Sequence, residues 1–115
     1  MYKLKNKVQL IGRAGNQPEI KQTASGKKYL RLSMATNEKY KNAGGEDVEE
    51  TQWHQVVAWG KLAELMADLV EKGQEILVTG KIKYHQYEDA QGVRRYATDI
   101  VADEFLSLSG RRAKG

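Results

Sequence analysis

Residues 51–61 read Thr51-Gln52-Trp53-His54-Gln55-Val56-Val57-Ala58-Trp59-Gly60-Lys61. The segment alternates like a β-strand and holds both tryptophans of the chain. Because successive side chains of a strand point to opposite faces, Trp53 and Trp59 share one face, while Val56 and Ala58 on the other face suit a core. Two large aromatic residues on the polar face of a strand suggest a surface on which nucleobases stack. Burial in a core or a subunit interface is an equally weighted alternative, since tryptophan is well buried on average.

Two further strand-like segments precede this one. Apolar and polar residues alternate from Leu4 to Leu10 and from Tyr29 to Met34, with glycine-containing turns between them. A short segment, residues 19–22, follows the only proline and could continue the first strand after a bend. Residues 37–50 are rich in Lys, Asn, Gly and Glu, and this composition predicts a long loop.

The pattern changes after the tryptophan segment. Apolar residues recur at helical spacing at Leu62, Leu65, Met66, Leu69 and Val70. They predict a helix over residues 61–72, with Gly73 as its stop. Alternation returns over residues 76–87 and again over 95–105, and the residues between them suit a hairpin turn. Tyr84 has the parity of Ile82, which predicts that it lies in the core, opposite Tyr87.

This order predicts a mainly β fold of the OB type, a five-stranded Greek-key barrel with one α-helix between strands 3 and 4. The length indicates one domain, residues 1–106, followed by a short basic tail, residues 107–115, that we expect to be disordered. OB barrels bind oligonucleotides or oligosaccharides across strands 2 and 3. The tryptophan segment is strand 3, and its place shifts the balance toward stacking.

Composition narrows the function further. Nineteen Lys and Arg against fifteen Asp and Glu give a net charge of +4, a mild excess that favours anionic partners. The absence of cysteine excludes disulfides and thiolate zinc sites. No segment suits a signal peptide or a bilayer span, so we expect a cytoplasmic protein without membrane contact.

Catalytic chemistry finds little support in the sequence. His54 and His85 fall on different predicted strands without metal-binding spacing, so we expect no metal, no cofactor and no enzymatic activity. His85 is expected on the surface, and His54 as a hydrogen-bonded structural or interface residue. Asp99, Asp103 and Glu104 could hold Mg²⁺ in a nuclease, a weaker alternative because acids on such a strand more often face solvent.

Aromatic residues are interleaved with basic ones along the predicted strands and loops. Stacking tolerates any base sequence, and cations neutralise phosphates. The candidate phosphate contacts are Lys7, Arg31, Lys39, Lys61, Lys81 and Lys83.

Several motifs resemble those of bacterial-type single-stranded DNA-binding proteins. They are Asn6-Lys7-Val8, Leu10-Ile11-Gly12, Pro18-Glu19, Ala35-Thr36-Asn37-Glu38, Thr51 to Val57, Gly60-Lys61-Leu62-Ala63-Glu64 and Lys72-Gly73. The resemblance covers roughly residues 4–105. It implies an OB-fold, commonly a homotetramer, that coats single-stranded DNA without sequence preference during replication, recombination and repair in the cytoplasm, at the nucleoid. It also implies that the stacking residues are Tyr40, Trp53, Trp59 and Tyr87, and that His54 lies near a subunit interface.

The chain departs from this family at its C-terminal end. Members commonly carry a long tail with an acidic end that recruits replication and repair partners, whereas this sequence ends in Arg111-Arg112-Ala113-Lys114-Gly115. Recruitment through such a tail is therefore not expected. A dimeric accessory OB protein of replication restart is the alternative within the binding class.

Overall fold

The computed structural model describes residues 5–108. Its elements are β1 (Val8–Ala14), β2 (Lys21–Gln22), β3 (Lys28–Lys41), β4 (Asp47–Trp59), α2 (Gly60–Leu69), β5 (Glu75–Glu88) and β6 (Arg94–Ser107). The strands form one sheet in the order β1-β5-β6-β4-β3-β2, and β1 also pairs with β3, which closes five of them into a barrel. The helix lies between the third and fourth barrel strands. The predicted OB-fold is confirmed; the predicted basic tail lies, from residue 109, outside the described residues.

The barrel closes where β1 crosses β3. Arg13 of β1 lies opposite Ala35 of β3, and β1 pairs with β5 along its other edge. Gly12 sits at the crossing, where an added Cβ would collide with the Ala35 carbonyl oxygen. Only glycine lets the two backbones approach this closely.

The core fills the barrel and the space under α2. The largest fully buried side chains are Leu30, Leu32, Met34, Met66, Ile76, Val56, Val70 and Val78. The helix is shorter than the sequence predicts: it ends at Leu69, and the Val70 amide donates to the Met66 carbonyl at 2.9 Å. Gly73 lies in the turn that follows, with φ +88°, and its amide donates to Ala14 at 2.8 Å. This last bond ties the end of the helical segment to β1.

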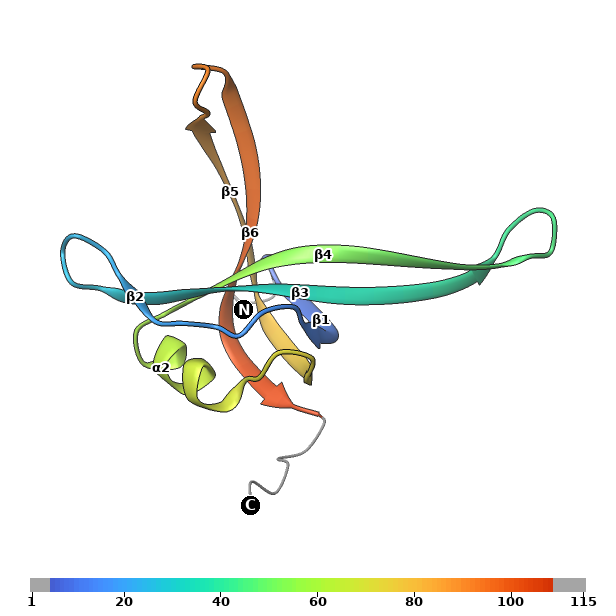
Figure 1. Ribbon diagram of the computed structural model, residues 1–115, viewed down its shortest axis with the longest axis horizontal. Helices are drawn as coiled ribbons and strands as arrows, with labels where there is room; N and C mark the ends of the chain where they lie inside the picture. Colours follow the sequence, from blue (N-terminus) through green and yellow to red (C-terminus); the bar gives the residue numbers. More distant parts are fainter. Residues whose placement is uncertain (1–4, 109–115) are drawn as a thin grey trace.

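Two long hairpins extend beyond the barrel. Figure 1 shows β3 and β4 running together far to one side, while β5 and β6 rise from the barrel at a steep angle to them. The loop predicted over residues 37–50 is therefore wrong, since only residues 42–46 lie between the strands. Cross-strand polar contacts support the extension, among them Lys41–Asp47 at 2.9 Å and Thr51–Asn37 at 2.7 Å.

Tyr84 also contradicts its prediction. It keeps the parity of Ile82 on β5, yet its side chain is 72% exposed. The physical reason is that this part of β5 belongs to the projecting hairpin (Figure 1). Alternation continues along the strand there, but no second layer covers the face that was apolar inside the barrel.

Over residues 5–108 the structure contains no helix with the length and hydrophobicity needed to cross a lipid bilayer.

Candidate nucleic-acid interface

A groove of about 590 Å³ lies where the β5–β6 hairpin leaves the barrel. Its walls come from the β2–β3 turn, from β3 and β4, and from the facing surface of β5 and β6. The lining residues are Thr23, Ser25, Lys27, Arg31, Val57, Trp59, Lys81, Lys83, His85, Asp99 and Val101. Four of them are Lys or Arg, so this groove, hereafter the main groove, presents cations beside an aromatic ring.

Asp99 lies at the floor of the main groove, with its side chain only 12% exposed. Its Oδ1 is 3.6 Å from Nη1 of Arg31 on β3, and its Oδ2 is 3.1 Å from Nε2 of His85 on β5. The sequence-based view of Asp99 as a solvent-facing acid is therefore wrong. His85 contacts a carboxylate, and its side chain is 38% exposed.

A second groove, of about 360 Å³, meets the main groove at Arg31 and runs along β3. Polar contacts order its walls. The Ser33 amide donates to Oδ1 of Asn16 at 2.8 Å, and Nε2 of Gln55 donates to Oγ of Ser33 at 3.2 Å. The two grooves thus form one path across the β3–β4 surface, with Arg31 at the junction.

The tryptophans lie in different surroundings. Trp59 lines the main groove, whereas Trp53 is not among the lining residues of either groove and lies two residues along β4 from Gln55 of the second one. Trp53 is 62% exposed, and its ring packs so close to Gly15 that an added Cβ would be 2.6 Å from Cζ3. Trp59 is 44% exposed and packs against Tyr29, with ring centroids 5.3 Å apart. Val57 shares their face but is buried, because β6 pairs beside it. Both indoles nevertheless keep an exposed ring surface.

The two tyrosines of the predicted set lie on the hairpins. Tyr40 is on β3 opposite Val48, with the parity of Met34 rather than of Ala35, the residue that faces Trp53. Alternation therefore puts it on the other face of the β3–β4 hairpin. Tyr87 is on β5 beyond the main groove, its ring centroid 6.4 Å from that of His85. Both rings are half exposed.

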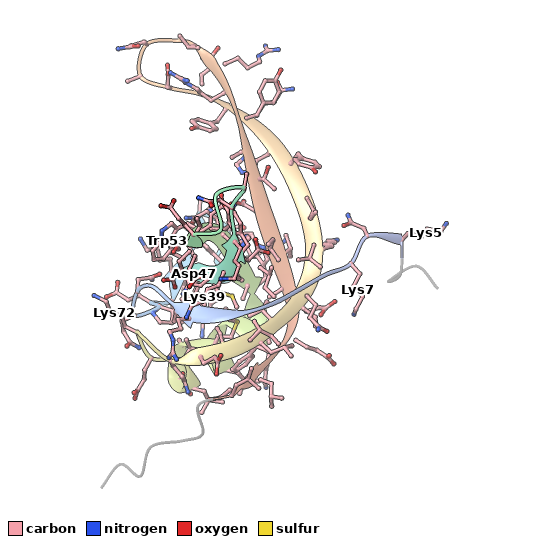
Figure 2. The ribbon with its side chains drawn as sticks, turned by 90° about the vertical axis from the view of Figure 1, so that its right-hand side faces the viewer. Lys5, Lys7, Lys39, Asp47, Trp53 and Lys72 are labelled. Carbon is pink, nitrogen blue, oxygen red and sulfur yellow. The ribbon has the colours of Figure 1, made fainter. Side chains whose placement is uncertain are left out.

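The predicted cations are only partly brought together. Arg31, Lys81 and Lys83 line the main groove. Lys39 lies on the β3–β4 hairpin opposite Glu49, and Lys61 is the second residue of α2. Figure 2 shows the sixth, Lys7, well apart from Trp53 and Lys39, with the β5–β6 hairpin between them in that view. Near Lys7, the Asn6 amide side chain pairs with the backbone of Ile82 at 3.0 Å in both directions.

Sequence reasoning missed several lining residues. Lys27, Thr23 and Ser25 come from the turn before β3, whose approach to the groove is set by tertiary structure. The pair Lys27-Lys28 beside a Ser-Gly turn was the available signal. Lys28 itself points elsewhere and pairs with Glu64 of α2 at 3.0 Å.

His54 is half-buried on β4, with Nε2 2.9 Å from Oγ1 of Thr36. The three acids proposed for a nuclease do not converge. Asp99 faces the main groove, whereas Asp103 accepts a hydrogen bond from Thr79 at 2.6 Å and lines a different groove with Glu104. Within residues 5–108 there is no group of three or more His, Asp or Glu placed to hold a metal ion.

Comparisons with known proteins agree with this geometry. Residues 5–108 match the single-strand binding protein family. The chain is 42% identical over 106 residues to the single-stranded DNA-binding protein of Xanthomonas axonopodis pv. citri, covering 92% of this chain and 59% of that one. It is 38% identical over 111 residues to single-stranded DNA-binding protein 1 of Chlorobaculum tepidum, covering 96% and 68%. The chain thus spans less than two thirds of the first relative's length.

Solved structures show the same fold. A Plasmodium falciparum SSB in complex with ssDNA superposes with a TM-score of 0.80 at 28% identity, covering 90% of this chain and 94% of the other. A deletion mutant of the Thermus aquaticus single-stranded DNA-binding protein gives 0.79 at 33% identity, covering 92% and 51%. The match over all of the described residues, together with the OB barrel, shows that the chain belongs to the single-strand binding protein family.

Proposed function

We propose that this chain binds and protects single-stranded DNA without sequence preference, at the cytoplasmic sites of replication, recombination and repair. The observation that carries the proposal is the path of two connected grooves, with cations along it, the exposed indole of Trp59 in the main groove and that of Trp53 two residues along β4 from Gln55 of the second groove. Relatives named single-stranded DNA-binding protein and a solved complex with ssDNA support the same ligand. Family membership argues against the nuclease alternative.

Base stacking and phosphate neutralisation would both contribute to the free energy of DNA binding. Each base stacked on Tyr40, Trp53, Trp59 or Tyr87 would contribute about 1–3 kcal/mol. Trp53 and Trp59 are six residues apart on β4, hence roughly 20 Å, so they would hold different nucleotides. In the main groove, phosphates would be neutralised by Arg31, Lys81 and Lys83. Further along the path of the DNA, the same role would fall to Lys39, Lys61 and Lys7. Because phosphate contacts release counterions, binding would weaken as salt rises.

Titration of the intrinsic tryptophan fluorescence with oligo(dT) tests this proposal. Trp59 lines the main groove and Trp53 is exposed on the same strand face, so we expect strong quenching at low salt and a midpoint that moves to higher DNA concentration as NaCl is added. Oligo(dC) should quench similarly, because stacking does not select a base. Duplex DNA of equal length is the control, since its bases are not available for stacking. The absence of quenching by oligo(dT) at low salt would contradict the proposal.

The chain is also proposed to assemble as a homotetramer. An apolar row crosses the outer surface of the barrel, in which Ile11 of β1 is opposite Leu77 of β5 and Leu77 is opposite Leu106 of β6. Ile11 and Leu106 are exposed. Exposed apolar clusters on a small domain usually mark contact surfaces, which supports an interface at this row. His54 is the further interface candidate. A dimer, as in a replication-restart accessory protein, is the competing assembly.

A further inference from the structure

The main groove contains an anion where a phosphate backbone is expected to pass. Of the residues 5–108 that line the groove, Asp99 is the only acidic one, and it lies among Lys27, Lys81 and Lys83 as well as Arg31. On β6 it stands directly opposite Lys83 of β5. A carboxylate in this position cancels part of the positive charge that a nucleic acid would meet.

The contacts of Asp99 are close but poorly directed. The 3.6 Å separation from Arg31 is longer than an ordinary N–H···O hydrogen bond. Nε2 of His85 lies 3.1 Å from Oδ2, yet it is buried and has no hydrogen-bond partner of acceptable angle. The His85 contact is thus a close approach rather than an aligned hydrogen bond. Arg31 and His85 therefore both have an exchangeable partner, and their own side chains still reach the groove surface.

The cluster also stands at the seam between the two hairpins. β4 and β6 pair in parallel only at Val56–Ile100 and Val57–Val101, and Asp99 immediately precedes this pairing. Arg31 comes from the β3–β4 side of the seam and His85 from the β5–β6 side. One carboxylate thus contacts a guanidinium from one wall of the groove and an imidazole from the other.

We propose that Asp99 is the groove's internal counter-ion, a positioning residue that holds Arg31 and His85 in the DNA-free protein and is replaced by a DNA phosphate on binding. The proposal rests on the proposed function. In the free protein Asp99 keeps the two side chains aligned across the groove; in the complex they turn to the phosphate. Part of the binding free energy is spent on breaking the Asp99 contacts, so the carboxylate lowers the affinity while it orders the site.

The test compares Asp99→Asn with Asp103→Asn by anisotropy of labelled oligo(dT) at several NaCl concentrations. Asparagine keeps the shape of Asp99 and can still accept hydrogen bonds, but it lacks the charge. We expect roughly threefold to fivefold tighter binding at low salt. The slope of log K against log[NaCl] should become steeper by up to about 0.7. When DNA binds to the wild-type protein, a sodium ion has to take the place of Arg31 at the Asp99 carboxylate, and Asp99→Asn removes this uptake of a cation.

Asp103→Asn is the matched control, since it makes the same charge change on the same strand but outside the main groove. Asp99→Asn binding no more tightly than Asp103→Asn would overturn the proposal. Failure of the wild-type protein to bind oligo(dT) would instead refute the proposed function itself, so the two failures are distinguishable.

A second measurement needs no Asp99 variant. The chain has two histidines, so the ring resonances of His85 are assignable by their loss in His85→Gln. Saturation with oligo(dT) should shift the His85 ring resonances, because the partner of Nε2 changes. His54, bonded to Thr36 away from the groove, should shift less. An unchanged His85 resonance in the saturated complex would overturn the exchange, whether or not Asp99→Asn folds.

Discussion

The indole of Trp53 packs against Gly15, the residue that follows β1. This contact explains the orientation of the ring, since Gly15 has no side chain that would prevent the indole from lying over the backbone. The Gly15 amide also donates to the Ser33 carbonyl at 2.6 Å, which fixes the segment under the ring. The absence of a side chain at Gly15 therefore allows Trp53 to take the orientation that the proposed stacking site needs.

Gly15→Ala should weaken oligo(dT) binding while the fold persists. The new methyl group would be 2.6 Å from Cζ3 of Trp53 and 3.1 Å from the Ser33 carbonyl oxygen, so the exposed ring has to move. Loss of one stacked base would cost about 1–3 kcal/mol, or roughly 5- to 150-fold in Kd. Fluorescence titration measures the change, and circular dichroism checks the fold.

Gly44→Ala is the matched control for this substitution. An added Cβ there meets only Oδ1 of Asn42, at the ordinary distance of 3.5 Å. Its binding should equal that of the wild-type chain. If Gly15→Ala also binds with wild-type affinity, the orientation of Trp53 is not what matters for DNA, and the stacking role of this residue would have to be abandoned.

At the scale of elements, the turn of the β5–β6 hairpin is organised by Asp89. Its Oδ1 accepts the amides of Gln91 and Val93 at 2.9 and 3.0 Å, and its Oδ2 accepts Nε of Arg95 at 2.9 Å. These bonds, the Arg95 contact first and the Val93 amide next, hold the pKa of Asp89 below its usual 3.8. The charged carboxylate therefore supports the turn that ends the strand carrying Tyr87.

The turn should loosen in acid. Because the folded pKa is lower than the unfolded one, the unfolded chain binds more protons, and stability rises with pH through this range. The contribution of Asp89 is complete above the unfolded pKa and is lost as the pH falls through the folded value, below 3.8. The Val93 amide resonance, followed from pH 6 to pH 2, should titrate with its midpoint below 3.8. Asp89→Asn should remove that titration, and a midpoint above 3.8 would contradict the role assigned to Arg95.

The same hairpins show which parts of the structure the sequence could predict. Inside the barrel one strand face packs on the core, so alternation at Leu30–Met34 and Ile76–Val78 identified those strands. Beyond the barrel both faces meet solvent, so the end of β3 and the start of β4 have the composition of a loop. Tyr84 was misplaced for the same reason. The signal for a strand there is cross-strand pairing, as between Lys41 and Asp47, which composition does not show.

The candidate binding site, like the fold, could be predicted from the sequence only in part. The exposure of Trp53 and Trp59 could be predicted because two aromatics shared a strand face with polar neighbours, while their role in stacking stays a prediction. Asp99 could not be assigned a partner, because its contacts come from two other strands, at Arg31 and His85. From the sequence alone, an isolated acid on a strand is expected to face solvent, and only the tertiary structure shows that Arg31 and His85 lie beside this one.

At the scale of the whole molecule, the groove path and the apolar row lie on different parts of the surface. The path runs over β3, β4 and the facing side of the β5–β6 hairpin. The row crosses β1, β5 and β6 at Ile11, Leu77 and Leu106. The chain could therefore self-associate through the row while its grooves stay open to DNA. Several copies joined in this way would offer a longer track of stacking sites than one barrel provides.

Leu106→Glu should break this assembly. Leu106 is 59% exposed, so a charge there is tolerated in a monomer but would be buried without a partner in an apolar contact. Light scattering coupled to size-exclusion chromatography should give four times the chain mass for the wild type and a lower multiple for the variant. Val93→Glu, at a similarly exposed apolar residue near the hairpin turn, should keep the wild-type mass. A wild-type mass of two chains would favour the dimeric alternative, and an unchanged tetramer in Leu106→Glu would place the contact elsewhere.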